Sequence, residues 1–245
     1  MQSAAVTENT TTTEQQLVWR TLFQRRMSDL IHCASTSFLT GMQTIGLTAD
    51  QVPTLADINR RLTPITGWQA VEAAGFLPAK DFFASLARRA FPTVTRLRRI
   101  SELEYTPEPD IFHDVFGHVP MHADPVFADF LQRFGELASE VGTEPARQRM
   151  TRLFWFTVEF GLIREHNAIK VYGSGLISSH KECRHALSGN AQLRDFDLHA
   201  VFEQPFRHDD IQPVFFVIDS HRQLFAAVEE AHRTMSRGEL DAPLT

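Results

Sequence analysis

The chain has 245 residues, of which 43% are hydrophobic and 22% charged, with 12 glycines and 12 prolines. This composition excludes collagen-like, low-complexity and wholly disordered proteins. The formal net charge of −6 argues against a general affinity for nucleic acid or for anionic membranes. Two cysteines cannot build a disulfide framework, and no stretch approaches the about 18 uninterrupted apolar residues of a membrane span. We therefore expect a globular cytoplasmic protein.

The first half of the chain is expected to be helical after a disordered tail over residues 1–14, which has neither a basic start nor an apolar core. Apolar residues recur at helical spacing over 17–31, and a second helix is predicted over 54–62. A third is predicted over 81–90, ended by Phe91-Pro92.

The second half contains the clearest amphipathic helix, over 125–141, where phenylalanines and leucines share one face. Residues 152–163 are almost continuously apolar, which predicts a buried helix. Ser179 and Glu182 fit a capping box at the start of a further helix. Residues 214–218 have the β-branched and aromatic character of a short buried strand.

No repeat, long linker or composition shift divides the chain. We predict one mainly α domain (α+β with a few short strands) over 15–235, followed by a C-terminal tail over 236–245.

Two histidines five residues apart, His113 and His118, are the first candidate for chemistry. On an ideal α-helix this spacing is about 500° of rotation and about 7.5 Å of rise, so the side chains do not stack on one face. They can still converge on one point if Gly117 loosens the last turn and Pro120 ends it. The alternative is two ordinary, partly buried histidines among the eleven in the chain.

The second candidate is Glu159, which lies within the apolar run. A buried carboxylate costs several kcal/mol without a compensating partner. The alternatives are that Glu159 lies on a narrow solvent-exposed face of the helix, or that it forms an ion pair with Arg152 or Arg164. Two histidines and one carboxylate also form the facial triad that leaves open positions on Fe(II).

Three longer motifs resemble those of the pterin-dependent aromatic amino acid hydroxylases, and most closely the short bacterial phenylalanine hydroxylases. They are Tyr105-Thr-Pro-Glu-Pro-Asp-Ile-Phe-His-Asp-Val-Phe-Gly-His-Val-Pro120, Phe154-Trp-Phe-Thr-Val-Glu-Phe-Gly161 and Tyr172-Gly-Ser-Gly-Leu-Ile-Ser-Ser179. The resemblance runs from about residue 18 to 231, in the same order and with similar spacings. It implies a helical basket that uses Fe(II), a tetrahydropterin and O2 to hydroxylate an aromatic amino acid.

The resemblance also assigns the cofactor residues. It places iron on His113, His118 and Glu159, and makes Asp110 a candidate for orienting an imidazole, with a helix N-cap as its alternative. For the pterin it nominates stacking on Phe82, hydrogen bonds from the backbone around Gly75 and Leu77, and a nearby acidic residue, Asp114.

For the amino acid, the resemblance nominates Arg98 to bind the carboxylate, although the cluster Arg96, Arg98 and Arg99 also fits a solvated face. The proposed polar end of the pocket consists of Thr106, Gly175, Ser178 and Ser179, and its aromatic end of Pro109, Trp155 and Phe160. A tryptophan at position 155 narrows the pocket and favours a single-ring substrate, because the tryptophan hydroxylases tend to have the smaller phenylalanine there.

The chain departs from the family pattern at Phe76, Thr151, Phe154 and His208. His208 stands where phenylalanine enzymes tend to be apolar and tyrosine enzymes acidic. It either binds a phenolic substrate or redirects the attack to another ring carbon, or it is an exposed loop residue.

We therefore expect conversion of L-phenylalanine to L-tyrosine. The alternatives are a tyrosine 3-hydroxylase or a phenylalanine meta-hydroxylase, less favourably a tryptophan hydroxylase, and outside enzymes a helical protein that holds zinc. The chain ends near the end of the family's core, without the tetramerisation helix of animal relatives, and we expect a monomer.

Overall fold

The computed structural model describes residues 12–244 apart from 76, 105, 107 and 209. The N-terminal tail expected over 1–14 lies outside the described residues as far as residue 11. Its last residues are not a tail, because helix α1 begins at Thr13 and Thr12 forms a capping box with Gln15.

The helices and strands follow one another along the chain in an order that places most strands in the second half. They are α1 (Thr13–Cys33), α2 (Thr36–Ile45), α3 (Leu55–Thr66), β1 (Gln69–Ala73), α4 (Ala79–Leu86), β2 (Ala90–Val94), η1 (Ile100–Glu102), η2 (Phe112–His118), η3 (Val119–Ala123), α5 (Pro125–Glu140), α6 (Glu144–Phe154), η4 (Trp155–Glu159), β3 (Leu162–Glu165), β4 (Ala168–Val171), α7 (Ser174–Ser178), α8 (His180–Leu187), β5 (Gln192–Asp195), α9 (Leu198–Glu203), β6 (Val214–Ile218), α10 (His221–Ser236) and η5 (Glu239–Asp241).

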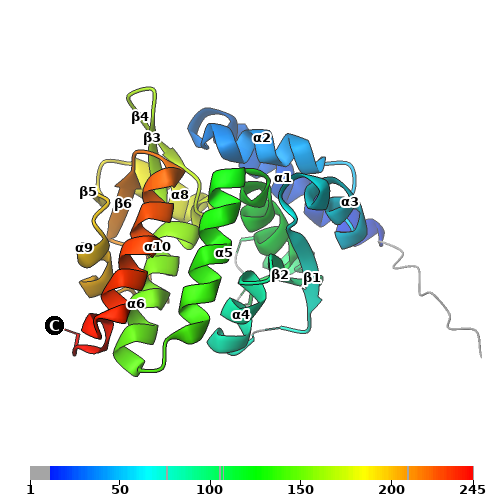
Figure 1. Cartoon of the computed structure of the whole chain (residues 1–245). Helices are drawn as coiled ribbons and strands as arrows, with labels where there is room; N and C mark the ends of the chain where they lie inside the picture. Colours follow the sequence, from blue (N-terminus) through cyan, green and yellow to red (C-terminus); the bar gives the residue numbers. More distant parts are fainter. Residues whose placement is uncertain (1–11, 76, 105, 107, 209, 245) are drawn as a thin grey trace, which may run out of the picture.

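Two small sheets flank a helical body (Figure 1). Strands β1 and β2 pair in parallel, beside α3 and α4. The larger sheet has the order β4-β3-β6-β5, in which only β3 and β4 are antiparallel. Helix α5 packs against both α4 and α10, so it connects the two halves of the molecule. The mainly α class with a few short strands agrees with the sequence prediction.

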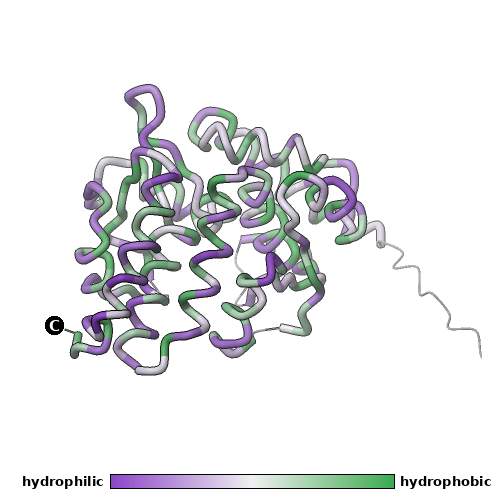
Figure 2. Tube along the Cα trace, viewed as in Figure 1, coloured by the Kyte–Doolittle hydropathy of each residue, from purple (hydrophilic) through white to green (hydrophobic). Residues whose placement is uncertain are grey.

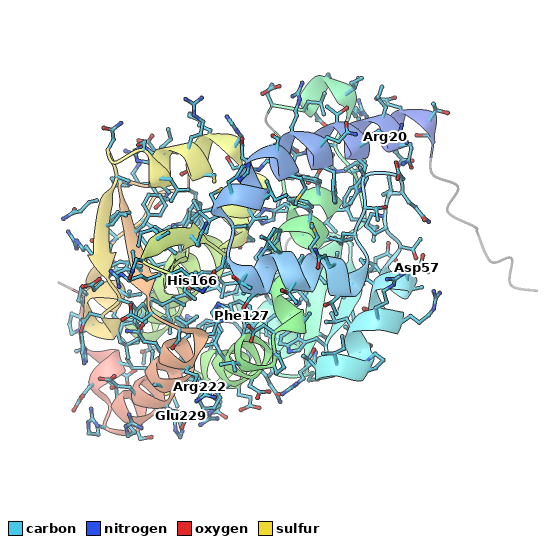
Figure 3. The ribbon with its side chains drawn as sticks, turned by 90° about the horizontal axis from the view of Figure 1, so that it is seen from above. Arg20, Asp57, Phe127, His166, Arg222 and Glu229 are labelled. Atoms are coloured by element: carbon cyan, nitrogen blue, oxygen red, sulfur yellow. The ribbon has the colours of Figure 1, made fainter. Side chains whose placement is uncertain are left out.

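Helix α5 shows how the sequence pattern places the core. Its Phe127, Phe130, Phe134 and Leu137 are buried, as the amphipathic pattern predicts. Figure 2 shows hydrophilic and hydrophobic residues alternating along the outer helices at the spacing of helical turns. In the view from above, Phe127 lies within the body of the molecule, whereas Glu229 on α10 lies at its edge (Figure 3).

Two expected helices are wrong in their extent. The run 152–163 is helical only as far as Glu159, because α6 continues into the π-helical η4 and Leu162 and Ile163 then begin β3. Periodicity cannot distinguish these states in a continuously apolar segment. The helix expected over 81–90 ends at Leu86, and Phe91-Pro92 lies inside β2. A strand paired on one side tolerates proline, because its outer edge needs no N–H donor.

The segment expected as a C-terminal tail over 236–245 is also ordered in part. Leu240 is buried, and the Arg149 guanidinium donates hydrogen bonds of 2.8 and 2.6 Å to the carbonyls of Leu240 and Ala242. The chain therefore packs onto α6 after α10 has ended. Among the described residues, no helix is both long enough and apolar enough to cross a membrane.

Candidate metal and substrate site

Both segments that carry the candidate metal ligands are π-helical. The turn η2 runs over Phe112–His118 and η4 over Trp155–Glu159, and each closes with a backbone hydrogen bond from a residue to the fifth residue before it. A turn of this kind is wider than an α-helical turn, so residues five apart come close to the same face. This local geometry brings His113 and His118 together, which an α-helix would not do.

The three candidate ligands converge. His113 Nε2 and His118 Nε2 lie 3.3 Å apart. The Glu159 carboxylate lies 3.1 Å from His118 Nε2 and 3.7 Å from His113 Nε2. Ligand atoms bound about 2.0–2.2 Å from one metal ion lie roughly 3 Å from their neighbours. The donor set and its spacing therefore fit one divalent ion.

The hydrogen bonds of His113 fix its tautomer. Ser178 Oγ donates to the carbonyl of Ser174 at 2.8 Å, and His113 Nδ1 lies 3.0 Å from the same Oγ. Because the hydroxyl proton is already used, Nδ1–H is the donor to Ser178. Nε2 then carries a lone pair that faces Glu159 and His118, as a metal ligand requires.

Ser174 is a buried residue of this site that the sequence reasoning missed, although its motif had been singled out. Its Oγ donates to Glu159 at 2.7 Å and lies 2.9 Å from His118 Nε2. Close backbone packing makes this possible, since a Cβ at Gly173 would lie 2.5 Å from the carbonyl oxygen of Glu159. The two glycines around Ser174 were the available signal, because glycine permits such an approach.

The charge of the site resides on Glu159. Burial alone would raise the pKa of Glu159, but its interactions with His118, His113 and the Ser174 hydroxyl lower it to about 2. Burial raises the pKa of the neighbouring Asp114 to about 6. A buried carboxylate that stays ionised needs a cation opposite it.

Asp114 is the alternative third ligand. Ligand atoms of His113, Asp114 and His118 all lie within 4.8 Å of one another. One of its carboxylate oxygens, however, accepts a 2.7 Å hydrogen bond from the backbone N–H of Val94. The geometry favours Glu159, because its carboxylate is the one toward which both Nε2 atoms point at 3.1–3.7 Å.

Arg98, nominated for the substrate carboxylate, is paired within the protein. Its Nε and Nη2 donate to the two oxygens of Asp110 at 2.8 and 2.9 Å, and its backbone N–H also donates to Asp110. Asp110 in turn accepts a hydrogen bond from the backbone of His113 at 3.1 Å. Asp110 thus positions the His113 backbone and not its imidazole. Within the described part of the chain, Nη1 of Arg98 forms no hydrogen bond, whereas Nε and Nη2 are both used by Asp110.

The predicted pterin residues lie on a partly open segment next to the histidines. Phe82 is half-buried and packs edge-on against Phe154, 5.5 Å between centroids, and Phe154 lies 6.4 Å from the ring of His118. Leu77 is 39% exposed, and a Cβ at Gly75 would meet no atom within 4 Å. The backbone near Gly75 is therefore open to a ligand.

The predicted aromatic end of the pocket is a cluster of rings. Trp155 lies 4.7 Å from Phe160 and is stacked on Phe206 at 4.4 Å, while His208 meets both Trp155 and Phe206 edge-on at 4.8 Å. A Cβ at Gly175 would lie 2.9 Å from the Phe160 ring. The aromatic residues and Gly175 are thus brought together.

A buried amide that sequence reasoning missed holds this cluster. Gln212 is 1% exposed, accepts a hydrogen bond from Trp155 Nε1 at 3.1 Å and donates to the carbonyl of Arg207 at 2.6 Å. An isolated glutamine carries no sequence signal for such a role.

Three further residues were nominated for the amino acid pocket, namely Thr106, Pro109 and Ser179. Pro109 immediately precedes Asp110, and Thr106 Oγ1 donates to the carbonyl of Glu108 at 3.1 Å. The Ser179 hydroxyl caps helix α8, where it accepts from the backbone of Glu182. The first half of the predicted capping box is present, and the hydroxyl of Ser179 is used by the fold.

Comparison with known proteins places this architecture in a family. Residues 3–239 match the family model "Biopterin-dependent aromatic amino acid hydroxylase". The chain is 42% identical over 210 residues to a phenylalanine-4-hydroxylase of Ralstonia nicotianae, covering 85% of this chain and 67% of that protein. This chain belongs to the biopterin-dependent aromatic amino acid hydroxylase family.

Solved structures give the same result. The crystal structure of Chromobacterium violaceum phenylalanine hydroxylase with bound Fe(III) matches with a TM-score of 0.90 at 37% identity, covering 96% of this chain and 86% of that chain. A second structure of that enzyme, with iron(III) and oxidised cofactor 7,8-dihydrobiopterin, matches with a TM-score of 0.86 at 37% identity, over 93% and 84% of the two chains.

Proposed function

We propose that this chain is an iron- and tetrahydropterin-dependent monooxygenase that converts L-phenylalanine to L-tyrosine. The observation that carries the proposal is the convergence of His113, His118 and Glu159, at 3.1–3.7 Å between each histidine and the carboxylate. It occurs in a chain 42% identical to a phenylalanine-4-hydroxylase. Two neutral imidazoles and one carboxylate are the ligand set of non-heme Fe(II) oxygenases, which keep coordination positions open for O2 and substrate.

Iron and the reduced pterin, when bound, would activate O2, and O2 would supply the oxygen atom that enters the aromatic ring. The protein's own residues position and enclose the reactants. Ser178 holds His113 in the ligand tautomer, and Ser174 holds the Glu159 carboxylate. The half-buried face of Phe82 is the platform for the flat pterin ring, and the backbone near Gly75 and Leu77 supplies hydrogen bonds to its edge.

The amino acid is bound at two ends. Nη1 of Arg98 takes the carboxylate, because Nε and Nη2 are already used by Asp110. The ring lies against Trp155 and Phe160, whose indole and phenyl groups are 4.7 Å apart. An indole at position 155 leaves less room for a two-ring substrate. The protein acts on a small molecule, and we propose that it works as a cytoplasmic monomer.

Product analysis tests this proposal. Purified protein is loaded anaerobically with Fe(II) and given tetrahydrobiopterin, O2 and an equimolar mixture of the three aromatic amino acids. Mass spectrometry is expected to show L-tyrosine formed from L-phenylalanine as the main product. If iron binds but no hydroxylated product forms, the proposal is contradicted. That result would favour a metal-holding protein without this activity.

A second candidate function is hydroxylation of tyrosine, or of phenylalanine at the meta carbon. One observation favours it: the imidazole of His208 lies edge-on to Trp155 at 4.8 Å, where it can reach a polar group on the substrate ring. The same experiment separates the candidates, because dihydroxyphenylalanine or meta-tyrosine would then be the main product.

A further inference from the structure

The only two cysteines of the chain lie against each other, although 150 residues separate them. Cys33 is the last residue of α1 and Cys183 lies on α8. Their Sγ atoms are 3.8 Å apart and share a hydrogen bond, and both thiols are free. Cys183 is 4% exposed, whereas Cys33 is half-buried, so small molecules reach the pair from the Cys33 side.

The surroundings of the pair favour one thiolate. The hydrogen bond from Cys33 and the adjacent Arg26 guanidinium lower the pKa of Cys183, although burial opposes this. The same hydrogen bond, with burial, raises the pKa of Cys33. The charge of Asp29 raises the pKa of Cys183. Its carboxylate, however, also contacts His180 Nδ1 at 2.8 Å and the Arg26 guanidinium at 3.5 Å. A thiolate beside an arginine and next to a second thiol is the environment of an oxidation-sensitive cysteine.

We propose that Cys33 and Cys183 form a peroxide-sensitive dithiol that closes reversibly to an intramolecular disulfide between α1 and α8. The Cys183 thiolate attacks one oxygen of hydrogen peroxide, forms the S–OH bond and releases hydroxide, which takes the Cys33 proton and becomes water. The Cys33 sulfur then attacks the sulfenic sulfur, the S–S bond forms, and hydroxide leaves. Two sulfur atoms are oxidised by one electron each, and one peroxide is reduced by two.

The dithiol is linked to the metal site through Arg26. This buried side chain donates from Nε to the carbonyl of Ile177 at 2.7 Å and from Nη2 to that of Leu176 at 3.1 Å. Both carbonyls belong to α7, whose last residue, Ser178, holds His113 Nδ1 at 3.0 Å. Closing the disulfide draws the sulfurs from 3.8 Å to about 2.05 Å and removes the negative charge beside Arg26. We expect the hydrogen bond between His113 Nδ1 and Ser178 to weaken as a result.

The oxidation itself does not depend on the proposed reaction, whereas its effect on metal binding rests on the proposed His113–His118–Glu159 site. The first test is therefore chemical. Reduced protein is treated with stoichiometric hydrogen peroxide, and free thiols and intact mass are measured. The proposal predicts loss of both thiols, a mass lower by two hydrogen atoms, no covalent dimer, and full recovery with dithiothreitol. Two persistent thiols, or oxygen added to one sulfur without an S–S bond, would overturn it.

Single variants assign the two roles. In Cys33→Ser, peroxide is expected to leave a sulfenic acid on Cys183 that dimedone traps, because no resolving thiol remains. Cys183→Ser removes the thiolate stabilised by Arg26. Its remaining Cys33 thiol is expected to react with peroxide at least tenfold more slowly than Cys183 reacts in Cys33→Ser. Equal rates for the two variants would overturn the assignment of Cys183 as the attacking sulfur.

A second test measures the link to the metal site. The affinity for Co(II), used as a spectroscopic probe, is compared between reduced and disulfide-closed protein, with Cys183→Ser, which cannot close the disulfide and has no thiolate beside Arg26 to lose, treated identically as the control. We predict an affinity roughly tenfold lower in the oxidised wild type and unchanged in the control. Equal affinities in both redox states would overturn the link but not the disulfide, and loss of Co(II) binding in every sample would instead contradict the proposed metal site.

Discussion

Asp110 holds Arg98 by a two-pronged ion pair, with Nε–Oδ2 and Nη2–Oδ1 distances of 2.8 and 2.9 Å, and it is fully buried. The same carboxylate accepts the backbone N–H of His113. Hydrogen bonds and charge from Arg98 lower the pKa of Asp110 against the opposing effect of burial. One buried acid therefore connects the group proposed to bind the amino acid with the first proposed metal ligand.

Asp110→Asn tests this connection. The substitution leaves the Arg98 guanidinium partly buried without its counter-ion, so we expect the free energy of unfolding to fall by about 3 kcal/mol. Urea denaturation measures this change. The control is Glu239→Gln, which breaks an equally two-pronged but exposed pair with Arg237 and should leave the unfolding midpoint unchanged. Equal effects of the two substitutions would contradict a special role for the buried pair.

Ser178→Ala is expected to weaken metal binding without removing a ligand. The hydroxyl accepts from His113 Nδ1 and so keeps Nε2 unprotonated toward the metal. Loss of such outer support lowers metal affinity by about 10–100-fold. Ser188→Ala, which removes an exposed hydroxyl bonded to the carbonyl of His185, is the matched control. Co(II) titration of both variants makes the comparison, and wild-type affinity in Ser178→Ala would count against the tautomer assignment.

Asp124 should give the protein a pH-dependent stability that a variant can isolate. Burial would raise its pKa, but hydrogen bonds from His221 and Ser37 and the charge of His221 lower it well below 3.8. Because the folded-state pKa is the lower one, the stabilisation is complete above pH 3.8 and is lost as the pH falls further.

In Asp124→Asn the ionisable group is absent, whereas an oxygen acceptor at the N-cap of α5 remains. The wild type should exceed this variant in unfolding free energy by the largest amount near about pH 6, and the difference should shrink toward about pH 2. Chemical denaturation across this range measures it. A difference that is constant with pH would show that the carboxylate charge is not the cause.

His208→Ala tests whether this residue contacts the substrate ring. If His208 hydrogen-bonds a phenolic oxygen, its removal lowers kcat/KM for L-tyrosine relative to L-phenylalanine by up to about tenfold. It should also change the ratio of ring positions hydroxylated. His199→Ala, an exposed histidine on α9 paired with Glu230, serves as the control. Unchanged ratios of substrate preference and of ring positions would show that His208 is a loop residue that does not contact the substrate ring.

The sequence allowed the candidate ligands to be named, but spacing alone did not bring them together. On an α-helix His113 and His118 diverge, and the wider π-helical turns of η2 and η4 were not predicted from the residues. Resemblance to a family supplied that step. Ser174 and Gln212 were missed because a single buried polar residue becomes recognisable only when its partners are placed around it.

The fold was predictable where a pattern was strong and regular. Helix α5 and strand β6 appear within one residue of their predicted ends, since a sustained apolar stripe or a short β-branched run distinguishes them. The parallel pair β1–β2 was not predicted, because its partners are separated by α4 and its strands are short. Residues 239–241 were expected in a tail, yet the long-range contact of Arg149 with Leu240 orders them.

The central claim is that Glu159 completes a metal site with His113 and His118, and metal binding by Glu159→Gln tests it most directly. The glutamine keeps the size of the side chain but removes the charge that both imidazoles face. Anaerobic equilibrium dialysis against Fe(II) should find one ion per wild-type chain and an affinity lower by at least about 100-fold in the variant. Wild-type affinity in Glu159→Gln would contradict the account and direct attention to Asp114 as the third ligand.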